Sequence, residues 1–401
     1  MSNGKNHKSL HKAAILSVSA IVLTACGGGG GGGLFGSSSV LSGLAVDGYV
    51  QGATVFLDIN KNGVLDAGEP SATTDATGKY TLDYSAVSTS VTGLPIVVTG
   101  GIDTDTGNAF TGQLSARVDK ATTGQVVSPL TSLIDAVIAQ GLAADVDTAK
   151  TMIASGLGLT VAQLTSDPVA AIASNPAIYS TAVTLQRSVQ LLASANSIPS
   201  ETAQQTHERV VRALASTVVA QASPVNVSQL IAASGLQRAN ETRQFAETVK
   251  NSIEASLSAG GHDSAKKTLR GLDKVRVQME TDGTYSMTSA ADKLDAEKGL
   301  TTSRPYRSFI QNSSNSSSVA ALNNLFNTPP VAITQPANTT GRLLASNCFQ
   351  CHGTGGKVDL ATYPEMQVIC ESSYRALQAA ASWQLMPKAS HRAKSISSSL
   401  I

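Results

Sequence analysis

The sequence predicts a multidomain chain: a small antiparallel β-sandwich, then an all-α helical domain, then a second, small all-α domain. Its 401 residues exceed the length of one typical domain. Short β-rich runs separated by turn residues occupy the first third, and apolar residues at helical spacing dominate the middle. A proline-rich stretch precedes the last segment. We therefore expect several folded parts joined by linkers.

The charge balance argues against nucleic acid as a partner. The chain carries 29 basic and 28 acidic residues, a formal charge of +1. Three lysines lie in the first 25 residues, so a chain without that segment has 26 against 28, or −2. Nucleic-acid binding needs a concentrated basic surface, and the sequence contains no such stripe.

Residues 1–25 are predicted to be an export signal. Three lysines precede the apolar run "AAILSVSAIVL", which is too short to span a bilayer as a mature helix. The run ends in "LTAC", which resembles the bacterial lipoprotein box. The resemblance implies lipidation of Cys26 and a multi-acyl anchor, and Gly27 after it favours the outer membrane, on its periplasmic or surface face. The alternative is an ordinary signal peptide followed by an unrelated cysteine.

The next two segments are a tether and a β-domain. Residues 26–43 are rich in glycine and serine, which predicts a flexible tether. Residues 44–127 contain the β-rich runs "ATVFLDI", "KYTLDY" and "LPIVVTG", separated by turn clusters such as "DTDTGN". Strands this short at this spacing predict a small antiparallel sandwich.

One loop in the β-domain has the spacing of a calcium site. The segment "DINKNGVLDAGE" satisfies the pattern D-x-[DN]-x-[DN]-G-x5-E at every position. Calcium takes about six to eight oxygen ligands, and alternate side chains of such a loop converge on the ion. Gly63 permits the sharp turn, and Glu69 closes the loop with both carboxylate oxygens. The candidate ligands are Asp58, Asn60, Asn62, Asp66 and Glu69.

Strands, rather than the helices of an EF-hand, are expected on both sides of this loop. The surrounding passage resembles the calcium-binding B-type repeats of bacterial surface proteins and related transthyretin-like or carboxypeptidase-regulatory-like sandwiches. The resemblance implies a structural calcium ion. The alternative is a turn whose Asn, Asp and Gly residues bond their own backbone without a metal.

Residues 128–260 are predicted to be an all-α domain of five or six helices. Ser128 precedes Pro129 as a helix cap would, and apolar residues recur at helical spacing in the following runs. We expect His207, on one of these helices, to be a surface residue rather than a metal ligand, because no second ligand-type residue is spaced for a metal. Residues 261–333 are predicted to contain a hairpin around Asp282-Gly283 and then a linker, and residues 334–401 form the last domain.

That last segment contains the pattern Cys348-x-x-Cys351-His352, which is typical of covalent haem attachment. One helical turn places both thiols where they can add to the two vinyl groups of a haem, and the next residue presents its imidazole to the iron. A thioredoxin-like site would require a βαβ unit, and a zinc site a second ligand pair at the usual spacing. A structural disulfide would close a very small loop.

The passage around this motif resembles class I mono-haem cytochromes c. The resemblance implies a small all-α cytochrome c-like domain with His352 as the proximal iron ligand and a downstream methionine as the distal one. Met386, which precedes a proline, has the family's place, and a thioether ligand raises the reduction potential relative to a second histidine. Met366 and His391 are the alternatives. The family's closing C-terminal helix has no clear counterpart after Met386, and the state of Cys370 stays open.

These features predict a membrane-anchored periplasmic electron-transfer protein that carries one haem c, with unidentified redox partners. The sequence shows no substrate-converting constellation, so we do not expect an enzyme. The alternative is a surface scaffold or interaction lipoprotein with a structural calcium site and a vestigial or truncated haem domain. A haem-based ligand sensor with an open sixth position is a third interpretation.

Overall fold

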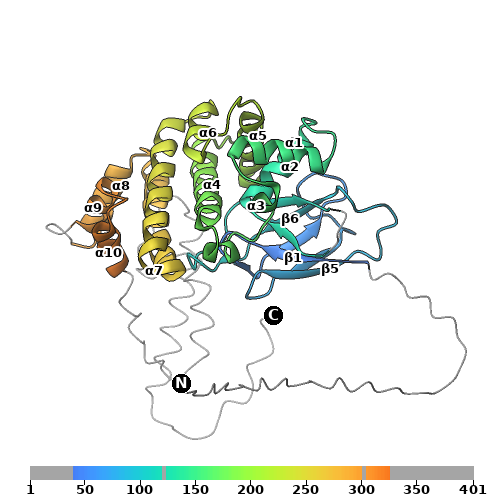
Figure 1. Cartoon of the computed structure of the whole chain (residues 1–401), viewed down its shortest axis with the longest axis horizontal. Coiled ribbons are helices and arrows are strands. Elements are labelled where there is room, and N and C mark those ends of the chain that lie inside the picture. The colour runs from blue at the N-terminus through green and yellow to red at the C-terminus, as the bar shows by residue number, and fades with distance from the viewer. Residues whose placement is uncertain (1–38, 120–122, 300–303, 326–401) are drawn as a thin grey trace, which may run out of the picture. The chain divides into compact units, whose positions relative to one another are not determined.

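The computed structural model describes residues 39–119, 123–299 and 304–325. An N-terminal β-region with several sheets is followed by a larger helical part, as Figure 1 shows. This confirms the coarse prediction of strands first and helices after them. The β-region and the helices up to Asn323 belong to one compact unit.

The described strands of the β-region form three sheets, ordered β5-β1-β9, β2-β7 and β4-β3-β6-β8. All neighbours pair antiparallel except β1 and β9, which are parallel. The expected purely antiparallel pairing is therefore wrong at this edge. The strands are β1 Val40–Ala45, β2 Val50–Gln51, β3 Thr54–Leu57, β4 Ser71–Thr73, β5 Lys79–Asp83, β6 Pro95–Thr99, β7 Ile102–Asp103, β8 Gln113–Arg117 and β9 Gln125–Val127.

The buried faces of these strands make their own apolar core. In β5 every second residue is buried, so Tyr80 and Leu82 point inward while their neighbours face solvent. Leu41 of β1 is fully buried in the same cluster, beside Leu57 and Ile96. The strand therefore begins at Val40, inside the segment predicted to be tether, because its apolar residues complete this core.

The helical part begins directly after β9. Ser128 caps α1 in a reciprocal capping box with Thr131, and Pro129 takes the first helical position, as the sequence predicted. A short 3₁₀ turn, Ala170–Ala173, precedes α4. The helices are α1 Pro129–Ala139, α2 Val146–Leu157, α3 Val161–Leu164, α4 Pro176–Ala195, α5 Ala203–Val219, α6 Val227–Ala233, α7 Ala239–Asp282, α8 Met287–Glu297, α9 Pro305–Gln311 and α10 Ser316–Asn324.

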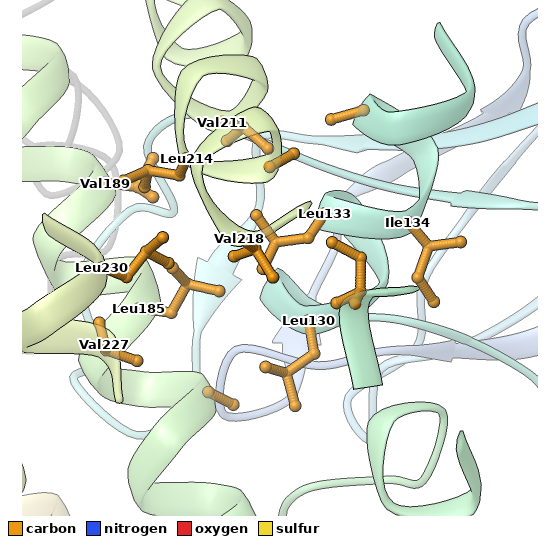
Figure 2. Packing of buried hydrophobic residues seen from close by; sticks show 14 of the residues in the cluster. Leu130, Leu133, Ile134, Leu185, Val189, Val211, Leu214, Val218, Val227 and Leu230 are labelled. Carbon is orange, nitrogen blue, oxygen red and sulfur yellow. The ribbon is translucent and has the colours of Figure 1, made fainter. Parts of the chain in front are cut away.

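Apolar side chains from helices α1 to α7 meet in a second core, part of which is shown in Figure 2. Each fully buried aliphatic side chain contributes about 1.5–3 kcal/mol relative to exposure, so this cluster contributes strongly to the stability of the helical part. The labelled residues are Leu130, Leu133 and Ile134 of α1, Leu185 and Val189 of α4, Val211, Leu214 and Val218 of α5, and Val227 and Leu230 of α6.

Helix α1 also joins the two parts through hydrogen bonds to strand β8. The backbone N–H of Ser115 donates to Ser132 Oγ at 2.9 Å, and Thr131 Oγ1 donates to the Ser115 carbonyl at 2.9 Å. All three residues are buried. The boundary predicted between 127 and 128 is thus the start of a helix that follows β9 and packs on β8, a strand of the neighbouring sheet.

The predicted hairpin around Asp282-Gly283 is wrong. Asp282 ends the long helix α7, and Gly283 follows it in the left-handed conformation, with φ of 62°. The pair is thus a helix end, since glycine is favoured at this position of a C-terminal cap. Leu272, Val275 and Met279 are fully buried at helical spacing along the same segment.

Residues 261–333, predicted to be hairpin and linker, are helical over most of the part that the structure describes. Gly260 and Gly261 interrupt α7 with non-helical backbone angles, and α8, α9 and α10 follow it. Asp295 of α8 accepts hydrogen bonds from the backbone N–H groups of Tyr306 and Arg307, which satisfies free donors at the start of α9. Within the described ranges, no helix is both long enough and apolar enough to cross a bilayer.

Candidate functional site

Most of the predicted site residues lie outside the described residues. These are Cys26, the haem-motif residues Cys348, Cys351 and His352, the distal-ligand candidate Met386 and its alternatives Met366 and His391, and also Cys370. The structure therefore bears on the calcium-type loop, residues 58–69, which connects β3 to β4. Strands flank this loop on both sides, as predicted.

The first residue of the loop organises its turn. Asp58 is 2% exposed, and its two carboxylate oxygens accept hydrogen bonds from the backbone N–H groups of Asn62 (3.1 Å) and Gly63 (2.8 Å). Gly63 has φ of 77°, in the left-handed region that a residue without a Cβ adopts at low cost. The predicted role of this glycine in the sharp turn is confirmed.

The last residue closes the loop onto its beginning. Glu69 Oε1 accepts from the backbone N–H of Ile59 at 2.7 Å, and Oε2 accepts from the N–H of Asp66 at 3.1 Å. One carboxylate thus bridges the entrance and the exit of the loop. Both of its oxygens are used, although on backbone donors.

Three side chains converge inside the loop. Asp66 Oδ2 accepts from the side-chain amides of Asn60 at 2.6 Å and Asn62 at 2.7 Å. Three of the five predicted ligand positions are therefore brought together at one place. In this arrangement amide N–H groups, rather than a cation, balance the Asp66 carboxylate.

The loop suits calcium by the chemistry of its donors. Carboxylate and amide oxygens are the hard ligands that calcium prefers, and a flexible oxygen-rich loop is how proteins usually bind it. No group of three His, Cys, Asp or Glu side chains in the described part of the chain is arranged to hold a metal. Each carboxylate of the loop instead accepts hydrogen bonds from its own set of backbone or side-chain amide N–H groups.

The loop also contacts helix α5 and strand β8. Gln204 Nε2 donates to the Gly63 carbonyl at 2.9 Å and to Gln113 Oε1 at 2.7 Å. Glu208, one turn further along α5, has Oε2 within 3.5 Å of where a Cβ on Gly63 would stand. A cleft of about 280 Å³ lies between the loop, β8 and the helices α1 and α5, with Asp58 and Lys61 in its lining.

His207 of α5 lies beside this cleft and is buried, so the expectation of a surface residue is wrong. It is 3% exposed, and its Nε2 has no hydrogen-bond partner among the described residues. Burial lowers the pKa of the imidazole to about 4, so the ring is neutral at neutral pH. A spacing signal was present, because His207 shares a helical stripe with the buried residues Val210, Val211 and Leu214.

The structure contains a second polar site that the sequence did not indicate. Five ionisable residues meet between the β-region and the helices, and we call them the buried charge cluster. They are Asp47 after β1, Asp103 of β7, Asp105 beyond it, Arg187 of α4 and Asp273 of α7.

Arg187 is the central cation of the buried charge cluster. Its Nη2 donates to Asp103 Oδ2 at 2.5 Å and to Asp47 Oδ2 at 3.3 Å, and its Nη1 lies 3.9 Å from Asp273 Oδ1. Burial alone would lower the pKa of Arg187, but the surrounding carboxylates raise it above the usual range. Burial raises the pKa of Asp47 well above normal, which favours its uncharged form.

Asp105 extends the buried charge cluster towards solvent. It accepts hydrogen bonds from Tyr179 Oη at 2.6 Å and from His262 Nε2 at 3.0 Å, and Lys266 lies 3.7 Å away. Burial would raise the pKa of Asp105, but these partners lower it overall, His262 most. The cluster thus ties the β-region to α4 and to the second half of α7.

Comparison with known proteins adds no relatives: no family model, curated protein or solved structure matches the chain.

Proposed function

We propose that the chain is a membrane-anchored periplasmic electron-transfer protein that carries one covalently attached haem c. The observation that carries this proposal is the motif Cys348-x-x-Cys351-His352 in a chain whose N-terminus has the features of a lipoprotein export signal. Haem attachment of this type takes place outside the cytoplasm, so the two features support each other. The chain is not proposed to be an enzyme.

Each proposed ligand has one role. Cys348 and Cys351 hold the haem through thioether bonds, His352 is the proximal ligand to iron, and Met386 is the distal one. The bound haem supplies one-electron redox chemistry, while the protein sets its potential through the distal ligand and the surrounding polarity. Cys26 carries the lipid that keeps the protein at the outer membrane.

The test is to express the full chain in a bacterial host with cytochrome c maturation machinery and record the reduced spectrum of its pyridine derivative. We expect a thioether-type haem signal that stays with the protein after denaturation. The double variant Cys348→Ser, Cys351→Ser should lack it. Absence of that signal from the wild-type chain would refute the proposal.

Replacement of Met386 tests the distal ligand separately. If Met386 ligates iron, Met386→Ala abolishes the weak near-infrared band of methionine-ligated ferric haem and lowers the reduction potential. Met366→Ala is the matched control and should leave both unchanged. The opposite pattern would assign the ligand to Met366.

A second candidate function is a surface scaffold lipoprotein whose β-region holds a structural calcium ion. The observation in its favour is the convergence of Asn60, Asn62 and Asp66, within a loop that Asp58 and Glu69 close. These five residues would hold the ion, which would supply a fixed positive charge to the loop. A chain with no reversible iron couple that retains calcium binding and a cell-surface partner would favour this function.

A further inference from the structure

We propose that the calcium-type loop and helix α5 form a cation-dependent clasp, in which cation binding to the loop strengthens the contact between the β-region and α5. The inference rests on the structural calcium site proposed above and adds what that site controls. The clasp consists of Gly63 in the loop, Gln113 of β8, and Gln204 and Glu208 of α5.

The first argument is geometric. The Gly63 carbonyl, which accepts from Gln204, belongs to the same turn that Asp58 holds through the N–H groups of Asn62 and Gly63. A cation bound by this loop fixes that turn, and with it the direction of the carbonyl. Any change in how firmly this turn is held therefore alters the hydrogen bond from Gln204, in the first turn of α5, to the Gly63 carbonyl.

The second argument is electrostatic. Between Asp58 and Glu69 the loop carries three carboxylates and one lysine, Lys61, so its formal charge is −3 + 1 = −2. Glu208 places a further carboxylate next to Gly63, although Arg212 pairs with it from the next turn of α5. A divalent cation brings the loop to formal neutrality, which removes its repulsion of Glu208.

The third argument is the position of Gln204 on α5, one turn before His207, which packs against Gly112 at the same edge of the β-region. Gln204 donates both to the loop and to Gln113, which is 8% exposed at the start of β8. One side chain thus connects the loop, the sheet and the helix. Because coupling between two events is reciprocal, a clasp that cation binding tightens must in turn raise the affinity of the loop for the cation.

The experiment uses the full chain and two readouts, calcium titration calorimetry and amide hydrogen exchange of peptides covering residues 58–69 and 202–210. In the wild type, CaCl₂ should bind and slow exchange in both peptides, whereas EDTA should reverse the effect. In Gln204→Ala, calcium should still slow exchange in the loop but no longer in α5, and its affinity should fall by about fivefold or more.

Two variants serve as controls. Gln221→Ala removes an amide that donates to the Thr217 carbonyl near the other end of α5, and it should behave as the wild type. Asp66→Ala removes an exposed carboxylate at the point of convergence and should abolish both calcium binding and the exchange effect.

The outcomes separate the two proposals. If calcium binds and slows exchange only in the loop, or if Gln204→Ala binds it as tightly as the wild type, the clasp is refuted and the calcium site stands. If CaCl₂ neither binds nor alters exchange in the wild-type loop, the calcium site is refuted and the clasp with it.

Discussion

Replacement of the buried His207 by glutamine should make the protein less sensitive to mild acid. His207 lies on the buried face of α5, its Nε2 has no hydrogen-bond partner among the described residues, and burial lowers the pKa of its ring to about 4 from the ordinary 6.5. In the unfolded chain the ring takes up a proton near pH 6.5, whereas in the folded protein it resists protonation. Protonation of the ring therefore favours the unfolded state.

The sign and the size of the effect follow from this difference. A depressed pKa in the folded state contributes stability that is fully present above pH 6.5 and is lost as the pH falls towards 4. The full difference of roughly 2.5 pKa units corresponds to about 3 kcal/mol. Between pH 7.5 and pH 5, the linkage relation gives a loss of about 2 kcal/mol.

The assay is urea unfolding at pH 7.5 and at pH 5, followed by far-ultraviolet circular dichroism. Other groups titrate over the same range, so the relevant quantity is the difference in pH dependence between the wild type and His207→Gln. We expect the wild type to lose about 2 kcal/mol more than the variant on acidification. An equal loss in both proteins would show that the ring is hydrated or protonated in the folded state, and the argument from burial would fail.

Two further predictions test packing at the sites described above. Arg187→Met removes the central cation of the buried charge cluster and should lower the free energy of unfolding by about 3–5 kcal/mol in the same urea assay. Arg243→Ala removes only a surface ion pair, so as a control it should lower that free energy by less than about 1 kcal/mol. Gly112→Ala would place a Cβ about 2.5 Å from the ring of His207. It should lower the melting temperature by more than Gly107→Ala does, because φ is positive at both positions but the space beside Gly107 is open. Equal shifts would show that backbone strain alone causes the loss of stability.

The sequence could predict those structural features that are determined by residues close together in the chain. The loop from Asp58 to Glu69 contains its own determinants, and Ser128 with Pro129 marked the start of α1 correctly, because both signals act within a few residues. The hairpin around Asp282-Gly283 failed, because glycine after an aspartate suits a tight turn and a helix end equally well.

The buried charge cluster could not have been predicted in this way. Arg187 lies 140 residues from Asp47 and 84 from Asp103, and only the packing of α4 on the β-region brings them together. No local pattern marks a carboxylate that will be buried opposite a distant arginine. His207 was different, since its place in an apolar stripe was a local signal of burial that the prediction of a surface residue did not use.

The interruption of α7 has a mechanical consequence. Gly261, with φ of 63° and ψ of −156°, adopts a backbone conformation that other residues reach only under strain. The helix axis is therefore broken at the glycine pair, and the two halves are joined across the break by the hydroxyls of Ser256 and Thr268, which are 2.6 Å apart. The second half is also joined to the β-region, because Asp105 accepts a hydrogen bond from His262 and Asp273 accepts one from the side-chain amide of Asn108, so that side-chain contacts rather than one continuous helix axis connect it to the rest of the molecule.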